Sequence, residues 1–385
     1  MDGLGTALGW VRGQQAEMER MLRTLVDVNS HTAEVANVNR VGDLLRECFS
    51  ISGLTSETRA SKATGNHLVW GTSAPGKRTM LVGHHDTVFP PGTFEGMREE
   101  GPLLRGPGVL DMKGGLLVVR FALRALAEAG VLDRVAVTVI SVGDEEVGSE
   151  DSAPHIKALC KEASSALVFE AGRTNDAIIT RRKGTGSMTA VAHGKAAHAG
   201  NAHEQGINAI WALARFIDGA QQLTSYPNGV TVNVGKVSGG IGKNTVPDRA
   251  EAVSDFRFVT MADGRALVDR FSEVGKAAEA AVAGARVELL GGIKRMPLER
   301  SDASLALMER YAAAARECGL GTPEAPLLGG GSDANTTSSA GVPSIDGLGP
   351  RGKGFHTQDE QIERETLLPK TEALVRFLWA EHLAG

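Results

Sequence analysis

The spacing of apolar positions predicts alternating helices and short strands in the first half of the chain. Residues 13–28 and 37–50 place apolar side chains three or four positions apart, which is the spacing of amphipathic helices. Continuous apolar runs predict buried strands at 78–83, 135–142 and 166–170, and a further helix is predicted at 113–129. Helices that alternate with continuously apolar strands indicate an α/β sheet covered by helices on both faces.

The pattern changes at the basic, glycine-rich stretch RRKGTGS, residues 181–187, which we interpret as a linker. Beyond it the predicted order is strand, helix, strand, strand, helix and strand, at 187–193, 206–223, 230–237, 250–259, 262–283 and 286–290. This order describes an α+β unit that can stand alone. The chain then continues with helices at 303–318 and 364–383, which flank a glycine-rich loop at 329–333 and a strand at 342–346.

The expected organisation is one domain, residues 1–181 and 293–385, that is interrupted by a smaller inserted domain, residues 182–292. The length of 385 residues agrees with two or three domains of about 150 residues each. Glycine is abundant, with 48 residues, so tight turns and close approaches of the backbone are expected at several places.

Charge and composition exclude several classes of protein. The formal charge of −5, from 41 basic and 46 acidic residues, argues against nucleic acid or an anionic membrane as a partner. Cys48, Cys160 and Cys318 form no CxxC pair, which excludes a disulfide scaffold and a zinc finger. We expect no signal peptide, because charged residues interrupt the apolar positions of the first 25 residues. No run of 18 apolar residues predicts a membrane span, so we expect a cytoplasmic protein.

Acidic residues and histidines gather where the predicted strands end. Groups that can bind a metal occur at residues 84–86, Asp111, residues 144–146, Glu170 and His356. Each has an ordinary explanation by itself, such as a helix cap or a solvated turn. Open α/β sheets bind ligands at the carboxyl ends of their strands, so five such positions together favour a single site.

The residue types in this set point to a cation. Adjacent carboxylates at Glu145 and Glu146, if buried, need a cation or a proton to compensate them. Two zinc ions about 3.5–4 Å apart share a bridging carboxylate, with nitrogen and oxygen ligands on either side. Two histidines, one aspartate and two glutamates supply this set, and one glutamate remains as a base. A nicotinamide-dinucleotide site is not supported, because no GxGxxG follows the first predicted strand.

At these residues the sequence resembles the co-catalytic zinc metallopeptidases, a family that includes bacterial glutamate carboxypeptidase, aminoacylases, acetylornithine deacetylase and succinyl-diaminopimelate desuccinylase. Eight motifs carry the resemblance, in the family's order: GHHDTV, GPGVLDMKGG, GDEEVGS, FEAG, GKAAHAG, NTVPDRAEAVSDFR, GGGSDA and GFHTQDE. The likeness is strongest to the glutamate carboxypeptidase branch. It implies an α/β zinc-peptidase domain that is interrupted by a smaller α+β lid and dimerisation domain.

The resemblance implies two zinc ions per subunit, with cobalt or manganese as alternatives. His84 and Glu170 would hold one ion, Glu146 and His356 would hold the other, and Asp111 would bridge the two.

The same resemblance assigns two catalytic carboxylates. Glu145 would be the general base, which takes a proton from a metal-bridged water and passes it to the leaving nitrogen. Asp86 would orient the imidazole of His84. The Asp111–Met112 peptide is expected to be cis, although many members carry a second aspartate where this chain has Met112. His85 is expected to point away from the metals.

The inserted domain is implied to supply further groups. His198 would reach the active site of the neighbouring subunit and polarise the scissile carbonyl, which implies a homodimer. Asn244 and Arg257 would help to hold the carbonyl or the substrate carboxylate. From the second part of the catalytic domain, the backbone N–H of Gly330 and the hydroxyl of Ser332 would bind the same carboxylate.

The expected function is hydrolysis of the amide bond to a C-terminal amino acid, with a small peptide or an N-acyl amino acid as substrate. Two alternatives stay open: an N-acyl-amino-acid deacylase with the same metals and base, and a non-catalytic binding protein on the same fold. A glutamate side chain in the substrate would need a further cation, for which the candidates are Arg181, Arg182, Lys183, Arg295 and Arg351.

Overall fold

The chain leaves its first structural unit after Arg181 and returns to it at Arg300. We analysed a computed structural model that describes residues 3–383. Unit 1 contains the residues up to Arg181, Arg300–Leu327 and the residues from Ser332 onward, and unit 2 contains Arg182–Glu299 and Leu328–Gly331. The return lies beyond residue 293 because Leu298 still forms a β-bridge with Arg182 within unit 2.

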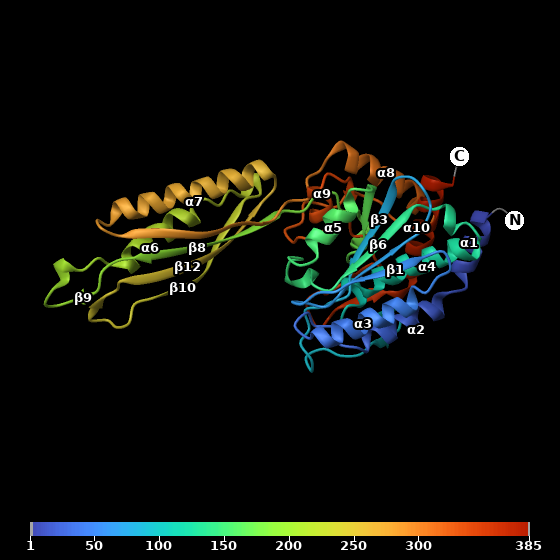
Figure 1. Ribbon diagram of the computed structural model, residues 1–385, viewed down its shortest axis with the longest axis horizontal. Helices are drawn as coiled ribbons and strands as arrows, with labels where there is room; N and C mark the ends of the chain where they lie inside the picture. The colour runs from blue at the N-terminus through green and yellow to red at the C-terminus, as the bar shows by residue number, and fades with distance from the viewer. Residues whose placement is uncertain (1–2, 384–385) are drawn as a thin grey trace. The chain divides into compact units, whose positions relative to one another are not determined.

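Unit 1 is built around a mixed sheet of six strands (Figure 1). In spatial order these are β1 (Thr55–Arg59), β2 (His67–Gly71), β6 (Val137–Val142), β3 (Arg78–His84), β7 (Ala163–Val168) and β14 (Ser344–Ile345). Strands β6, β3, β7 and β14 run parallel, and β1 and β2 add an antiparallel edge. The prediction of an α/β sheet is therefore confirmed.

Helices cover this sheet on both faces (Figure 1). α4 (Gly114–Glu128) packs on β3 and against α1 (Gly3–Arg12) and α10 (Leu367–His382). α5 (Ala153–Cys160) and α9 (Asp333–Ser339) contact each other and β7. The remaining helices of this unit are α2 (Gln15–Val26), α3 (Val35–Cys48) and α8 (Asp302–Arg316). Apolar side chains on α4 are buried on nearly all sides, because the helix lies between the sheet and two other helices.

A second, small sheet joins two segments that lie far apart in the sequence. Its strands, in spatial order, are β15 (Gly352–Lys353), β16 (Gln361–Glu363), β5 (Leu103–Arg105) and β4 (Arg98–Glu100). Ile362 of β16 lies opposite Leu104 of β5 in the antiparallel pairing. The loop after β5 and the loop between β15 and β16 are thereby held together, and both loops carry predicted site residues.

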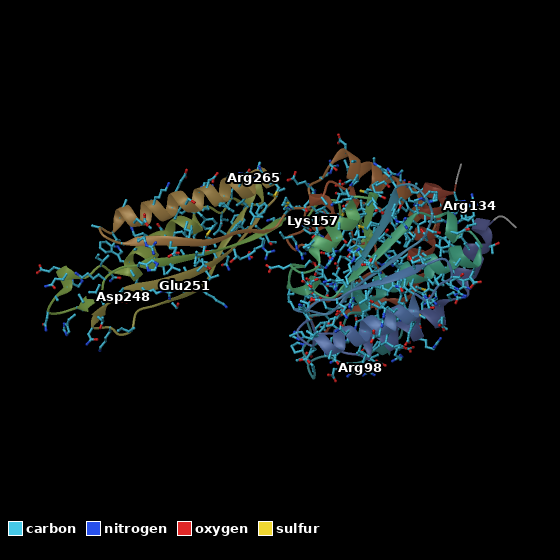
Figure 2. The ribbon with its side chains drawn as sticks, viewed as in Figure 1. Arg98, Arg134, Lys157, Asp248, Glu251 and Arg265 are labelled. Carbon is cyan, nitrogen blue, oxygen red and sulfur yellow. The ribbon has the colours of Figure 1, made fainter. Side chains whose placement is uncertain are left out.

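Unit 2 is a four-stranded antiparallel sheet with two helices. The strand order is β10 (Thr231–Gly239), β12 (Arg249–Phe258), β8 (Gly184–His193) and β13 (Arg286–Arg295). The helices α6 (Ala209–Gln221) and α7 (Met261–Ala281) pack on one face and bury Phe256, Phe258 and Phe271. Figure 2 shows Glu251 of β12 on the side of the sheet away from α7. A two-stranded pair, β9 (Ala197–His198) and β11 (Thr245–Val246), completes the unit.

Several elements differ from the expectation. The predicted linker at 181–187 is wrong for its second half, because β8 begins at Gly184. Its glycines serve packing, since a Cβ at Gly184 or Gly186 would overlap the rings of Phe258 and Phe256. The pattern also missed β1 and α1. The residues of β1 are mostly polar and exposed, so they show no apolar run.

Among residues 3–383, no helix is long and apolar enough to span a membrane.

Candidate metal centre

Three neighbouring parallel strands bring the predicted site residues to one edge of the sheet in unit 1. His84 is the last residue of β3, Glu145 and Glu146 follow β6, and Glu170 follows β7. Because β6, β3 and β7 are adjacent and parallel, their carboxyl ends lie side by side. Asp111 reaches the same place from the segment between β5 and α4.

His84, Asp111 and Glu170 form the first candidate metal group. Nε2 of His84 lies 3.2 Å from Oδ1 of Asp111 and 3.6 Å from Oε1 of Glu170. All three side chains are buried, and that of His84 is only 1% exposed.

Asp111, Glu146 and His356 form the second group. Nε2 of His356 lies 3.4 Å from Oδ2 of Asp111 and 3.1 Å from Oε2 of Glu146. His356 is half exposed, so this group is open to solvent on one side. The two oxygens of Asp111 thus face two different groups, which is the arrangement that a bridging ligand needs.

The donor atoms fit zinc in both type and spacing. Tetrahedral zinc with bonds of 2.0–2.1 Å places neighbouring ligand atoms about 3.3 Å apart. The four donor distances in the two groups run from 3.1 to 3.6 Å. Imidazole nitrogen and carboxylate oxygen are both ordinary zinc ligands.

The charges of the two groups also favour a cation. Burial, together with the charge of Asp111, raises the pKa of Glu170 well above its usual value. Burial likewise raises the pKa of Glu146, and hydrogen bonds to Asp111 and Glu146 raise the pKa of His356 to about 10. Carboxylates crowded in this way hold protons unless a metal ion compensates their charge.

Asp86 connects the first group to the residues after β6. Its carboxylate is fully buried and accepts the backbone N–H groups of Glu145 and Glu146, each at 3.2 Å. It also accepts the hydroxyl of Thr32 at 2.7 Å, and Oδ1 lies 3.4 Å from Nδ1 of His84. Nδ1 of His84 also lies 3.1 Å from the backbone carbonyl oxygen of Asp86. Asp86 therefore orients a predicted ligand through its carbonyl and carboxylate, and the backbone of the predicted base through its carboxylate.

Glu145, the predicted base, is half-buried, and its charge contributes to the raised pKa of Glu170 in the first group. The Asp111–Met112 peptide is cis, as the resemblance implies. His85 lies outside both candidate groups and is hydrogen-bonded to Ser141, and burial lowers its pKa to about 3.

Sequence reasoning missed three residues that support the site. Thr32 holds Asp86, and His67 accepts the backbone N–H of Gly143 just before the predicted base. Glu360 accepts backbone N–H groups of the segment that carries Asp111. For Glu360 a signal was available, since it ends the quoted motif GFHTQDE, of which only His356 received a role.

Unit 2 contains His198 and Asn244 on neighbouring segments. His198 is exposed, and its Nδ1 accepts the N–H groups of Gly200 and Asn201 at 3.1 Å each. The other ring nitrogen, Nε2, therefore carries the hydrogen of the neutral tautomer. Asn244 is also exposed, and its backbone carbonyl accepts the N–H of Ala199.

The other predicted substrate residues have partners. Arg257 forms an ion pair with Asp255 at 2.8 Å, and its guanidinium also donates to the carbonyl of Gly329. Gly330 is exposed, and its carbonyl accepts from Arg182. Ser332 lies in unit 1, where its hydroxyl caps α9 and donates to Asp346.

Arg351, one of the five basic candidates for a substrate side chain, lies in unit 1 among acidic residues. It lines a cavity of about 690 Å³, but its guanidinium meets Asp176, Glu363 and Glu365.

Comparisons with known proteins agree with this architecture. A model of the family described as Peptidase family M20/M25/M40 matches residues 80–380. Carboxypeptidase G2 from Pseudomonas sp. (strain RS-16) is 28% identical over 368 residues, which cover 93% of this chain and 87% of that protein. Acetylornithine deacetylase from Myxococcus xanthus is 28% identical over 204 residues, which cover 49% of this chain and 52% of that protein. The crystal structure of aminopeptidase PepT from Bacillus cereus ATCC 10987 shares the fold, with a TM-score of 0.78 and 23% identity over 96% of this chain and 99% of that one.

Proposed function

The chain belongs to peptidase family M20/M25/M40, and we propose that within this family of metal-dependent hydrolases it is a zinc-dependent carboxypeptidase. Its substrate is a small peptide or an N-acyl amino acid, from which it releases the C-terminal residue. The 28% identity with carboxypeptidase G2 over 93% of the chain supports this branch of the family.

The observation that carries the proposal is the two-sided position of Asp111. One oxygen faces His84 and Glu170, and the other faces His356 and Glu146. We propose that these five residues hold two zinc ions. Divalent cations at such a site polarise a carbonyl group and lower the pKa of water.

The protein's own residues supply the proton transfers and the orientation. Glu145 takes a proton from the attacking water and delivers it to the leaving nitrogen. Asp86 keeps the imidazole of His84 in a fixed orientation, and it holds the backbone of Glu145 through a hydrogen bond. A network of this kind keeps the base in place while it changes its protonation state.

We propose that His198 acts in trans, in a homodimer that forms through unit 2. Its Nε2–H is available as a donor to the developing oxyanion of the partner's substrate. A dimer is supported by exposed apolar side chains on unit 2, among them Trp211 (57% exposed) and Ile241 (88% exposed). Ile210 lies close to Gly240, the residue before Ile241. Its Cδ1 would be 3.3 Å from a Cβ atom placed on Gly240. In this proposal unit 2 is the lid and dimerisation domain.

For the substrate carboxylate we propose Arg257, together with Asn244 and the backbone N–H of Gly330, all of which belong to unit 2. A guanidinium pairs with a carboxylate through two parallel hydrogen bonds, and Arg257 can exchange its partner Asp255 for the ligand. The preference for glutamate over other C-terminal residues is part of the same proposal. The three free cysteines support a reducing compartment, for which we propose the cytoplasm.

A second candidate is an N-acyl-amino-acid deacylase, which the similarity to acetylornithine deacetylase favours. The test is to incubate the zinc-reconstituted protein with dipeptides and N-acyl amino acids that differ at the C-terminal residue. Free amino acid is measured with and without a chelator. Chelator-sensitive release from dipeptides that end in Glu or Asp supports the carboxypeptidase. Release confined to acetylated amino acids identifies the deacylase, and no release from any amide with two zinc ions bound contradicts both.

A further inference from the structure

Glu360 is a buried carboxylate that belongs to neither candidate metal group. Its Oε1 accepts the backbone N–H groups of Leu110 and Asp111 at 2.8 and 2.9 Å. Its Oε2 accepts the backbone N–H of Gly108 at 3.1 Å. Both oxygens are therefore used as acceptors, and all three donors lie in the segment that carries Asp111.

This segment needs an acceptor from outside, because its backbone is irregular. Gly108 has a left-handed conformation, and Asp111 has extended angles (φ −120°, ψ 87°) next to the start of α4. Regular helix or strand pairing cannot satisfy N–H groups in such a stretch, and buried N–H groups without an acceptor are costly. Successive N–H groups that converge in this way form a cradle for an anion, and here the side chain of Glu360 fills it.

Glu360 is also anchored to the segment that carries His356. Its own N–H donates to the carbonyl of Thr357, and its carbonyl accepts from Gly106. The next residues form β16, which pairs with β5. Glu360 is thus the point where the loop of one predicted ligand, His356, is tied to the loop of another, Asp111.

We propose that Glu360 is the positioning residue of the metal centre, which fixes Asp111 between its two ligand groups and couples it to the loop of His356. The inference rests on the proposed two-metal function and deepens it. The backbone N–H of Asp111 is held, so the bridging carboxylate starts from a fixed Cα and keeps one oxygen toward each group.

The geometry requires a carboxylate of this length. A glutamine in its place keeps only one acceptor oxygen and turns an NH₂ group toward either Gly108 or the pair Leu110 and Asp111. The NH₂ group of the glutamine then faces a backbone N–H group, and the backbone segment that carries Asp111 moves to separate the two donors. Glu363, three residues further on, serves as a matched control, because it is partly exposed and pairs with Arg351 instead of the Asp111 segment.

The experiment compares wild type, Glu360→Gln and Glu363→Gln as full-length, metal-free proteins. Zinc affinity is measured by titration against a fluorescent chelator, and kcat and KM are measured on a substrate that the wild type hydrolyses. We expect Glu360→Gln to weaken zinc binding by about 10–100-fold and to lower kcat at saturating zinc, while KM stays close to that of wild type. Glu363→Gln should stay within about twofold of wild type in both quantities.

A second measurement does not depend on the folding of a variant. In the metal-free wild type, the amides of Leu110 and Asp111 should exchange with deuterium as slowly as those of the central strands. Rapid exchange there, or zinc affinity of Glu360→Gln equal to that of wild type, overturns the inference while the proposed function stands. A wild type that binds no zinc and cleaves no amide overturns the proposed function, and the inference with it.

Discussion

Replacement of Asp86 by asparagine tests how one buried carboxylate organises the site. Asp86 is fully buried and accepts from Thr32, Glu145 and Glu146, and it lies beside His84. Asparagine keeps a single acceptor oxygen, so at least one backbone N–H group loses its acceptor whichever way the amide is turned: that of Glu145 at Oδ1, or that of Glu146 at Oδ2. A buried donor left without an acceptor costs about 1–3 kcal/mol.

This cost should appear in catalysis, because it disorders both a ligand and the base. At tenfold per 1.36 kcal/mol, Asp86→Asn should lower kcat/KM by about 5- to 150-fold at a fixed free zinc concentration. The assay is steady-state hydrolysis in a zinc buffer, with zinc content measured in the same samples.

The control is Thr32→Val, which removes one donor to the same carboxylate and leaves both oxygens in place. It should lose much less activity than Asp86→Asn. Equal activity of Asp86→Asn and wild type would refute the role of Asp86, and so would a loss that is matched by Thr32→Val.

Three further predictions concern the base, a buried lysine and the dimer. Glu145→Gln should keep its zinc content and lose turnover, as measured by metal analysis and amino acid release; unchanged turnover would rule out Glu145 as the base. Lys113 is buried and donates to the carbonyls of Leu25 and Val28, and burial lowers its pKa from 10.5 to about 7. Above about pH 7 the unfolded chain binds one proton more at Lys113 than the folded chain does, so the stability of wild type relative to Lys113→Met should rise with pH by up to about 1.4 kcal/mol per unit. Urea denaturation of both metal-free proteins at pH 7 and pH 9 measures this difference, and parallel pH profiles would contradict it. Trp211→Glu should convert the dimer into a monomer, whereas Arg265→Glu, at an exposed position on α7, should leave the protein dimeric. Light scattering measures the mass of each variant in solution.

The parts of the fold and of the site that the sequence predicts are those that depend on local patterns. Strands β3, β6 and β7 are largely buried on both faces, so they appear in the sequence as mostly apolar runs. Their ends carry the acidic residues and histidines, and for this reason the sequence pointed to His84 and Glu170 before any geometry was known. In contrast, α9 is a short, polar helix with the sequence DANTTSS, which has no amphipathic period, so the pattern of apolar positions does not predict it.

The missed residues act across long distances in the chain. Glu360 bonds to the Asp111 segment across 249 positions, and Thr32 bonds to Asp86 across 54. A pattern of apolar residues carries no record of such hydrogen bonds, because they depend on how loops meet after folding. The quoted motif around His356 did include Glu360, but its role became clear only from the three N–H groups that converge on it.

The two-metal centre can be seen directly in an anomalous difference map, collected at the zinc absorption edge from crystals of the zinc-reconstituted protein. If Asp111 bridges two zinc ions, the map should show two peaks about 3.5–4 Å apart on opposite sides of its carboxylate. One peak should lie beside His84 and Glu170, and the other beside Glu146 and His356. A single peak, or two peaks of which neither touches Asp111, would contradict the two-metal centre on which the proposed function depends.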